Sequence, residues 1–353
     1  MSVRPRRTRS AGRRQALVAL GLVGLMAAFG LGVYLGLGTL QSKAAQVVKP
    51  TDTRPAFTLP GTIILAQHGV LYQLRNGKFT ALIGPAGNWT QPALLPGGQR
   101  MIAVSQTGRH STITLLDANG HVVRPLVATG SPLRVDNHWT FYPRVTPNGT
   151  SVFYAYDLHD PYAGYLVDFA IMERSLIHPA APAVQWTIPN NYTGGDVEPA
   201  ALANGSLLYA KYNIDAAGHS FSQLWLQTKP GGGGGPLTTP QANCSEPALS
   251  PTQTEVAMVC ADNQLQVSRL EVASFTGGKL GPLRVVSPSI LAASPTWAPS
   301  GNGLIYLAPA GNGRVGPFQL WWLPNPTAAR PSAPKQVTQH LDLTATSQPA
   351  WGN

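Results

Sequence analysis

The chain has 353 residues, and its 32 Pro and 37 Gly are spread along the sequence rather than gathered in one tract. This composition predicts a large folded core with many turns and argues against a disordered chain. The formal net charge of +10 does not indicate nucleic-acid binding, because six arginines lie in the first fourteen residues and the remainder is nearly neutral.

The first forty residues have the pattern of a membrane anchor. The basic tail of residues 1–15 precedes "ALVALGLVGLMAAFGLGVYLGLGTL" (16–40), which contains no ionisable side chain except Tyr34. As a helix this stretch would span about 37 Å, more than the ~30 Å hydrocarbon core of a bilayer. The tail is expected to stay cytoplasmic, which places residues from about 41 onward in the periplasm or outside the cell. A cleaved signal sequence ending near "SKAAQ" (42–46) is the alternative.

Residues 41–60 show no apolar periodicity and contain three prolines. Such a segment is typical of an extended linker. The folded ectodomain is therefore expected to begin near residue 61.

A repeated pattern occupies residues 61–353: a proline, small or apolar residues, a tight turn and an apolar strand. "QPALLPGGQRMIAVS" (91–105) and "SPTWAPSGNGLIYLA" (294–308) are two examples. Apolar segments after each unit add two further strands, and helical periodicity is absent beyond residue 40. Four short antiparallel strands repeated about every fifty residues predict the blades of a β-propeller. The leading prolines of the six units are Pro92, Pro143, Pro199, Pro247, Pro295 and Pro349.

The sixth unit, "QPAWGN" (348–353), supplies only one strand. Three strands that lack a first partner lie at the beginning of the repeat region, at 62–67, 70–76 and 79–84. We therefore expect both ends to share one sheet, which closes the ring and removes exposed sheet edges. The predicted fold is all-β, a six-bladed propeller over residues 61–353 preceded by one transmembrane helix.

The repeats resemble those of TolB-type six-bladed propellers, whose units open with Pro-x-Trp-Ser-Pro-Asp-Gly. The fourth unit departs from this pattern, with Thr252 and Gln253 in place of Asp-Gly, and no region resembles the additional N-terminal domain of TolB itself. The resemblance implies a propeller in a bacterial envelope. Matches in the second and fifth units are Pro143, Pro147, Gly149 and Phe153, and Pro295, Trp297, Pro299, Gly301 and Ile305.

The two cysteines, Cys244 and Cys260, both lie in the fourth unit. With a turn centred near Thr252, they are opposite each other on antiparallel strands, at a separation that suits a disulfide. An extracytoplasmic compartment favours its oxidation. Two buried free thiols are the main alternative, and metal ligation by two cysteines alone is disfavoured.

Polar residues beside the leading prolines are candidates for a site on the central axis. They are Asp196, Glu198 and Glu246, with Gln91 and Gln348 in corresponding positions of other units. Because the first strands of the blades face the axis, these side chains could form a polar funnel for a divalent cation or a basic peptide. In the alternative interpretation they cap strand edges or are solvated.

A weaker metal candidate is the loop "YDLHDPY" (156–162), in which Asp157, His159 and Asp160 could ligate a divalent cation. Aspartates that hydrogen-bond their own turn are the alternative interpretation. No other cofactor is indicated.

The sequence contains no Gly-x-Ser-x-Gly nucleophile motif and no phosphate-binding loop. We predict a membrane-anchored extracytoplasmic scaffold that binds a protein or peptide partner in the cell envelope, an inference that rests on fold analogy. The alternative is a lyase or hydrolase acting on an envelope polysaccharide or peptide in the funnel, since some TolB-like propellers are similar to polysaccharide lyases. A sensor that signals through partners is a third interpretation.

Overall fold

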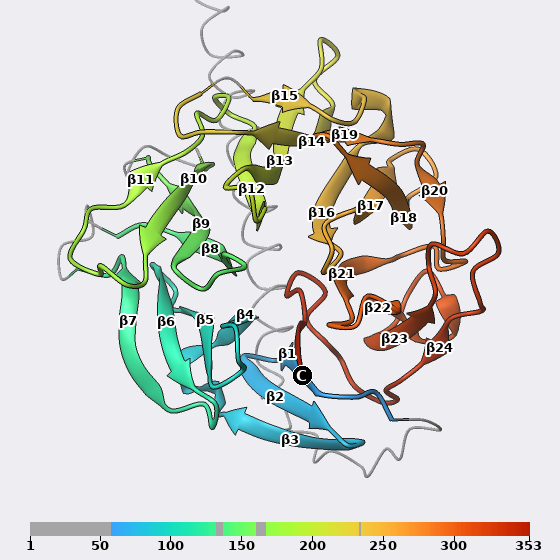
Figure 1. Cartoon of the computed structure of the whole chain (residues 1–353), viewed down its shortest axis with the longest axis horizontal. Helices are drawn as coiled ribbons and strands as arrows, with labels where there is room; N and C mark the ends of the chain where they lie inside the picture. Colours follow the sequence, from blue (N-terminus) through green and yellow to red (C-terminus); the bar gives the residue numbers. More distant parts are fainter. Residues whose placement is uncertain (1–57, 132–136, 160–166, 233) are drawn as a thin grey trace, which may run out of the picture. The chain divides into compact units, whose positions relative to one another are not determined.

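The computed structural model describes residues 58–131, 137–159, 167–232 and 234–353. In these residues, strands form five sheets arranged as a propeller around a central axis (Figure 1). Helical structure in this part of the chain is limited to 3-10 turns, namely η1 (Pro85–Gly87), η3 (Pro240–Ala242) and η4 (Ala310–Asn312). The predicted all-β propeller is confirmed.

The predicted cytoplasmic tail (1–15) and membrane helix (16–40) lie outside the described residues, together with most of the predicted linker (41–60). Within the described ranges, no helix combines the length and the apolar character needed to cross a membrane.

One sheet contains residues from both ends of the propeller, in the order β25, β1, β2, β3. Ile63 lies opposite Trp351 across the β25–β1 pair, and the Trp351 indole donates to the Pro60 carbonyl at 2.9 Å. The predicted sharing of a sheet by the two ends is confirmed. The strands are β1 (Thr62–Gln67), β2 (Val70–Arg75), β3 (Lys78–Ile83) and β25 (Ala350–Gly352).

Three further sheets follow the same up-and-down order. The first contains β4 (Trp89–Leu94), β5 (Arg100–Gln106), β6 (Ser111–Asp117) and β7 (Val122–Ala128). The second contains β16 (Cys244–Leu249), β17 (Glu255–Asp262) and β18 (Val267–Thr276), with β19 (Lys279–Leu280) and β20 (Arg284–Val285) both paired to β18. The third contains β21 (Ala293–Trp297), β22 (Gly303–Pro309), β23 (Phe318–Pro324) and β24 (Lys335–Gln336).

The remaining sheet has eight strands and consists of two antiparallel halves. The halves are joined by one short parallel pair, in which Asp168 lies opposite Gly194 and Phe169 opposite Gly195. Gly195 has a φ of +87°, and a Cβ placed there would lie 2.3 Å from the Phe169 nitrogen, so glycine permits this close approach. The first half is β8 (Thr140–Val145), β9 (Ser151–Asp157), β10 (Asp168–Ser175) and β11 (Val184–Gln185); the second is β12 (Gly194–Ala201), β13 (Leu207–Ile214), β14 (Ser220–Gln227) and β15 (Gly235–Pro236).

The hydrophobic core lies between neighbouring sheets. Ile102 of β5 and Val152 of β9 belong to one buried cluster, and Ala248 of β16 and Leu304 of β22 belong to another. Because both faces of a sheet are covered in this way, the second strands are continuous apolar runs; every residue of β22 is buried. The packing therefore holds the sheets in place around the axis, where their first strands meet.

Candidate functional site

The first strands of the first five repeats carry the same irregularity next to the leading proline. The register shifts by a bulge between residues 90 and 93 of β4, and equivalent bulges occur in β8, β12, β16 and β21. In each case the residue before the proline adopts a left-handed backbone, which is uncommon outside glycine. These pre-proline residues are Gln91 (φ 50°), Tyr142 (54°), Glu198 (55°), Glu246 (53°) and Ser294 (54°).

The pre-proline residues connect neighbouring repeats through hydrogen bonds. The Gln91 side-chain oxygen accepts from the Tyr142 backbone N–H at 2.7 Å, and the Gln91 backbone N–H donates to the Ser347 hydroxyl, also at 2.7 Å. On the other side of the axis, the Glu198 carboxylate accepts from the Glu246 backbone N–H at 2.6 Å. Two of these bonds join residues about fifty positions apart, and the Gln91–Ser347 bond joins residues 256 positions apart, so they hold the inner ends of the blades together.

The Glu246 carboxylate continues this arrangement by accepting from the Ser294 backbone N–H, and the Ser294 hydroxyl donates to the Ala345 carbonyl at 2.7 Å. Glu198 and Glu246 therefore act here as hydrogen-bond acceptors between repeats. This placement matches the structural interpretation of these residues given above, while cation or basic-peptide binding by them stays a prediction.

Burial and mutual repulsion shift the ionisation of this cluster. Burial raises the pKa of Glu198 to about 7, and burial together with the nearby Glu198 charge raises the pKa of Glu246 to about 8. Burial lowers the pKa of the Arg144 guanidinium to about 10, partly offset by the two glutamates. At neutral pH the two carboxyl groups are therefore partly protonated, whereas Arg144 is charged.

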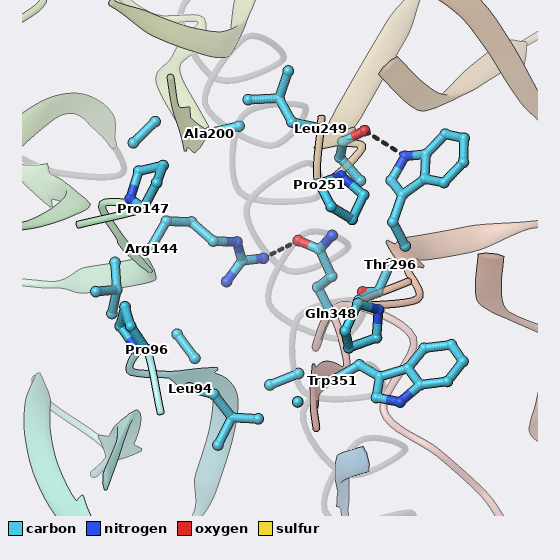
Figure 2. Close-up of a pocket in the computed structure, with 18 of the residues that line it drawn as sticks. Leu94, Pro96, Arg144, Pro147, Ala200, Leu249, Pro251, Thr296, Gln348 and Trp351 are labelled. Atoms are coloured by element: carbon cyan, nitrogen blue, oxygen red, sulfur yellow. Dashed lines mark hydrogen bonds between the residues drawn. The ribbon is translucent and has the colours of Figure 1, made fainter. Parts of the chain in front are cut away.

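A cavity of about 610 Å³ opens on the axis at the ends of the first strands. Figure 2 shows the Arg144 side chain pointing toward its centre, where the guanidinium donates to the Gln348 side-chain oxygen. The second guanidinium contact is with the Pro143 carbonyl at 2.8 Å, and the Gln348 amide donates in turn to the Pro295 carbonyl. We call this cavity, lined by Arg144, Gln348 and mostly apolar residues of the first strands and turns, the funnel.

The wall of the funnel contains apolar side chains beside polar ones such as Thr146 and Gln253. Leu94, Leu249 and Trp351 line it together with prolines of the turns that follow the first strands. The buried Trp297 indole donates to the Ala248 carbonyl at 3.0 Å, which fixes one side of the wall. Such a surface suits a ligand with apolar groups and few polar ones.

Asp196 is separate from the funnel. Its side chain is fully buried and accepts from the Lys211 ammonium at 2.9 Å, and Lys211 also donates to the Ile188 carbonyl at 3.0 Å. Burial raises the pKa of Asp196, an effect opposed by Lys211. The residue therefore forms a buried ion pair across β12 and β13.

The loop candidate is only partly described, because Asp160 lies outside the described residues. The Asp157 carboxylate accepts from the His159 backbone N–H at 3.1 Å, and the His159 ring lies 3.9 Å from Asp168. Asp168 in turn accepts backbone N–H groups of Tyr192, Thr193 and Gly194. Among the described residues, no cluster of three or more His, Cys, Asp or Glu side chains is arranged to hold a metal.

The disulfide prediction is confirmed. Cys244 and Cys260 lie opposite each other on β16 and β17 and are bonded. Both are buried, and neither cysteine lines the funnel.

The sequence analysis missed Arg144, Tyr142 and Ser294. A signal was present, because all of them lie within one residue of a leading proline. They were not predicted because only carboxylate and amide side chains beside the leading prolines were considered, whereas these residues are a tyrosine, a serine and an arginine.

Comparison with protein-family models found no match, and comparison with curated protein sequences found none either. Among solved structures, TolB from Acinetobacter baumannii is similar, with a TM-score of 0.61 and 15% identity over 82% of this chain, which corresponds to 66% of that chain. A TolB protein from Agrobacterium tumefaciens has a TM-score of 0.56 and 11% identity, covering 82% of this chain and 93% of that one. A nidogen/laminin complex has the same TM-score and identity, covering 82% and 97%. These likenesses show that the chain has a TolB-like β-propeller fold.

Proposed function

We propose that this protein is a membrane-anchored scaffold of the cell envelope that binds a protein or peptide partner in the funnel. The observation that carries the proposal is the cavity of about 610 Å³ on the axis, with apolar side chains in its wall and a charged guanidinium at its centre. Binding sites for small ligands and short peptide segments have this size and this mixture of apolar wall and few polar groups.

The comparisons support a protein partner only by analogy. One similar structure is of a nidogen/laminin complex, so in that case a propeller of this shape belongs to a complex of two proteins. A propeller is rigid because its sheets are packed on both faces, and a rigid surface loses little conformational freedom on binding. The partner is expected to insert an extended segment between the turns that surround the funnel.

We further propose that the ring has six blades. The eight-stranded sheet counts as two blades, because its halves are antiparallel units of four strands that share only a two-residue parallel contact. The described residues form six hydrophobic clusters, and each of them lies mainly between one unit and its neighbour. The interval of about fifty residues between leading prolines supports the same number.

The location outside the cytoplasmic membrane belongs to the same proposal. It is supported by the arginine-rich tail before the apolar stretch 16–40 and by the buried disulfide, since disulfides persist in oxidising compartments. Carbonate extraction of membranes tests the anchor: the full chain should stay in the membrane pellet, and a variant lacking residues 16–40 should be released.

Site-specific photocrosslinking tests the binding function. A photoreactive amino acid at Leu249, on the funnel wall, should form an adduct with one defined protein in native membranes, and the adduct should form again from the purified components. The control is Val315 between β22 and β23, whose side chain is 86% exposed and does not line the funnel. Equal labelling from both positions, or none from Leu249, contradicts the proposal.

A further inference from the structure

The position that follows each leading proline holds a small residue in every repeat except one. It is Arg144 in the second repeat, and in the others it is Ala93, Ala200, Ala248, Thr296 and Ala350. The four alanines are buried, so the fold accommodates the smallest side chain there. The fold therefore does not require an arginine at residue 144, and placing a guanidinium in a largely apolar site costs free energy unless a partner compensates for it.

Compensation from within the chain is incomplete. Arg144 donates to two neutral acceptors, the Pro143 carbonyl and the Gln348 side chain, although a guanidinium has five N–H donors. Among the described residues, none of the ion pairs involves Arg144.

The carboxyl groups of Glu198 and Glu246 interact electrostatically with Arg144, but both are hydrogen-bonded to backbone groups. Each accepts the backbone N–H of the next pre-proline residue, and their raised pKa values of about 7 and about 8 leave them partly protonated at neutral pH. The guanidinium thus lacks a full counter-charge of its own.

The Arg144 guanidinium faces the cavity, where a ligand could contact it. Arg144 is the one ionisable side chain among the described residues that line the cavity, and it points toward the centre (Figure 2). A carboxylate is the group that a guanidinium binds best, because two parallel N–H donors match its two oxygens.

We propose that the funnel binds the carboxylate of a short peptide segment, with Arg144 as the carboxylate-binding residue and Gln348 as its positioning partner. This inference rests on the proposed function and specifies the chemistry of its ligand. It reverses the charge expected from the sequence, where the ring glutamates indicated a cation or a basic peptide, because those glutamates are bonded to backbone groups. The carboxylate could belong to an Asp or Glu side chain or to a peptide C-terminus.

Two random hexapeptide libraries test the inference on the full chain in detergent. One displays the peptides internally, so that only Asp and Glu side chains supply carboxylates, and the other displays them with a free C-terminus. We expect enrichment of sequences with one carboxylate flanked by apolar residues. The internal library should be enriched if the carboxylate comes from an Asp or Glu side chain, and the other library if it comes from a peptide C-terminus. Amidation of the C-terminus, or replacement of Glu by Gln in the selected peptide, should weaken binding at least tenfold.

Arg144→Ala is the decisive variant, because it restores the residue that the other repeats carry and should fold normally. It should lose at least tenfold in affinity for the selected peptide, and the Gln-containing or amidated peptide should bind the variant and the wild type equally. Arg314→Met is the matched control, since Arg314 is exposed and bonded to the Leu265 carbonyl outside the funnel, and its affinity should be unchanged.

The outcomes separate the two proposals. Peptides without a carboxylate requirement, undiminished binding by Arg144→Ala, or a failure of both libraries to enrich any sequence overturns the inference. Crosslinking at Leu249 then decides whether the proposed function falls with it, because that measurement does not depend on the charge of the partner.

Discussion

Substituting Glu246 by Gln should change how stability depends on pH. The amide oxygen of Gln can still accept the Ser294 N–H, so the link between repeats remains while the ionisable group is removed. In the wild type, the folded-state pKa values of Glu198 and Glu246, about 7 and about 8, exceed the ordinary value of 4.5. The folded state therefore holds more protons than the unfolded state between pH 4.5 and 8, and stability must fall as the pH rises through this window.

The size of the effect follows from the linkage relation. Each carboxyl that is protonated only in the folded state contributes about 1.4 kcal/mol of lost stability per pH unit, or about 2.7 kcal/mol for both. Both side chains are partly exposed, so about half of this is a realistic expectation. Glu246→Gln removes one titrating group, and the variant should gain about 1 to 2 kcal/mol relative to the wild type between pH 5.5 and 8.

Denaturant unfolding of both proteins at several pH values measures this difference. Contributions from histidines are shared by the two proteins and cancel in the comparison. Asp262→Asn is the control, because the Asn oxygen can still accept the backbone N–H groups of Gln264 and Leu265 and the residue lies outside the ring of pre-proline residues; its stability difference should not follow the same pH profile. A wild-type stability that rises between pH 5.5 and 8, or a Glu246→Gln variant with an unchanged slope, would refute the electrostatic reasoning.

Three further changes test other contacts. Replacing Cys244 and Cys260 together by Ala should lower the free energy of unfolding by about 3 kcal/mol relative to the oxidised wild type, as expected for a loop of this length. The variant should be about as stable as the reduced wild type, and a variant as stable as the oxidised wild type would contradict the prediction. Asp196→Asn should cost about 3 to 5 kcal/mol because it leaves the Lys211 ammonium buried without its counter-charge, and adding Lys211→Met should recover much of that loss. Removing residues 347–353 should expose the edge of β1 and increase aggregation and protease sensitivity, whereas an unaltered, monomeric product would argue against ring closure as a source of stability.

The strands could be predicted from sequence because their signals are local. Apolar runs bounded by turn residues predict strands at 62–67 and 70–76, and the structure places them at Thr62–Gln67 and Val70–Arg75. Ring closure could also be predicted from the sequence. The last repeat has one strand and the beginning of the repeat region has three without a first partner, so the simplest pairing joins them in one sheet. The disulfide followed from the distance of each cysteine to its turn.

The site was harder to predict, because it depends on contacts between repeats. The bulge beside Pro247 turns the backbone of Glu246, and the Glu246 side chain then accepts from the Ser294 N–H in the next repeat. The sequence places Asp196 and Glu198 in one group because they are two positions apart. In the structure the two side chains have different partners. Along a regular strand such residues would share a face, but the bulge in β12 begins directly after residue 197 and separates them.

In a repeat protein, a residue that differs from the residues at the equivalent positions of the other repeats indicates a requirement of function and not of the fold. Residues that build the ring must satisfy the same packing requirement in each blade, which explains the small side chain after most leading prolines. Arg144 departs from that requirement and adds a charge that the neighbouring groups do not fully compensate. Stability alone gives no reason to retain such a residue, since alanine serves in the equivalent positions. Its presence at the centre of the funnel is therefore better explained by what the funnel binds than by how the ring is held together.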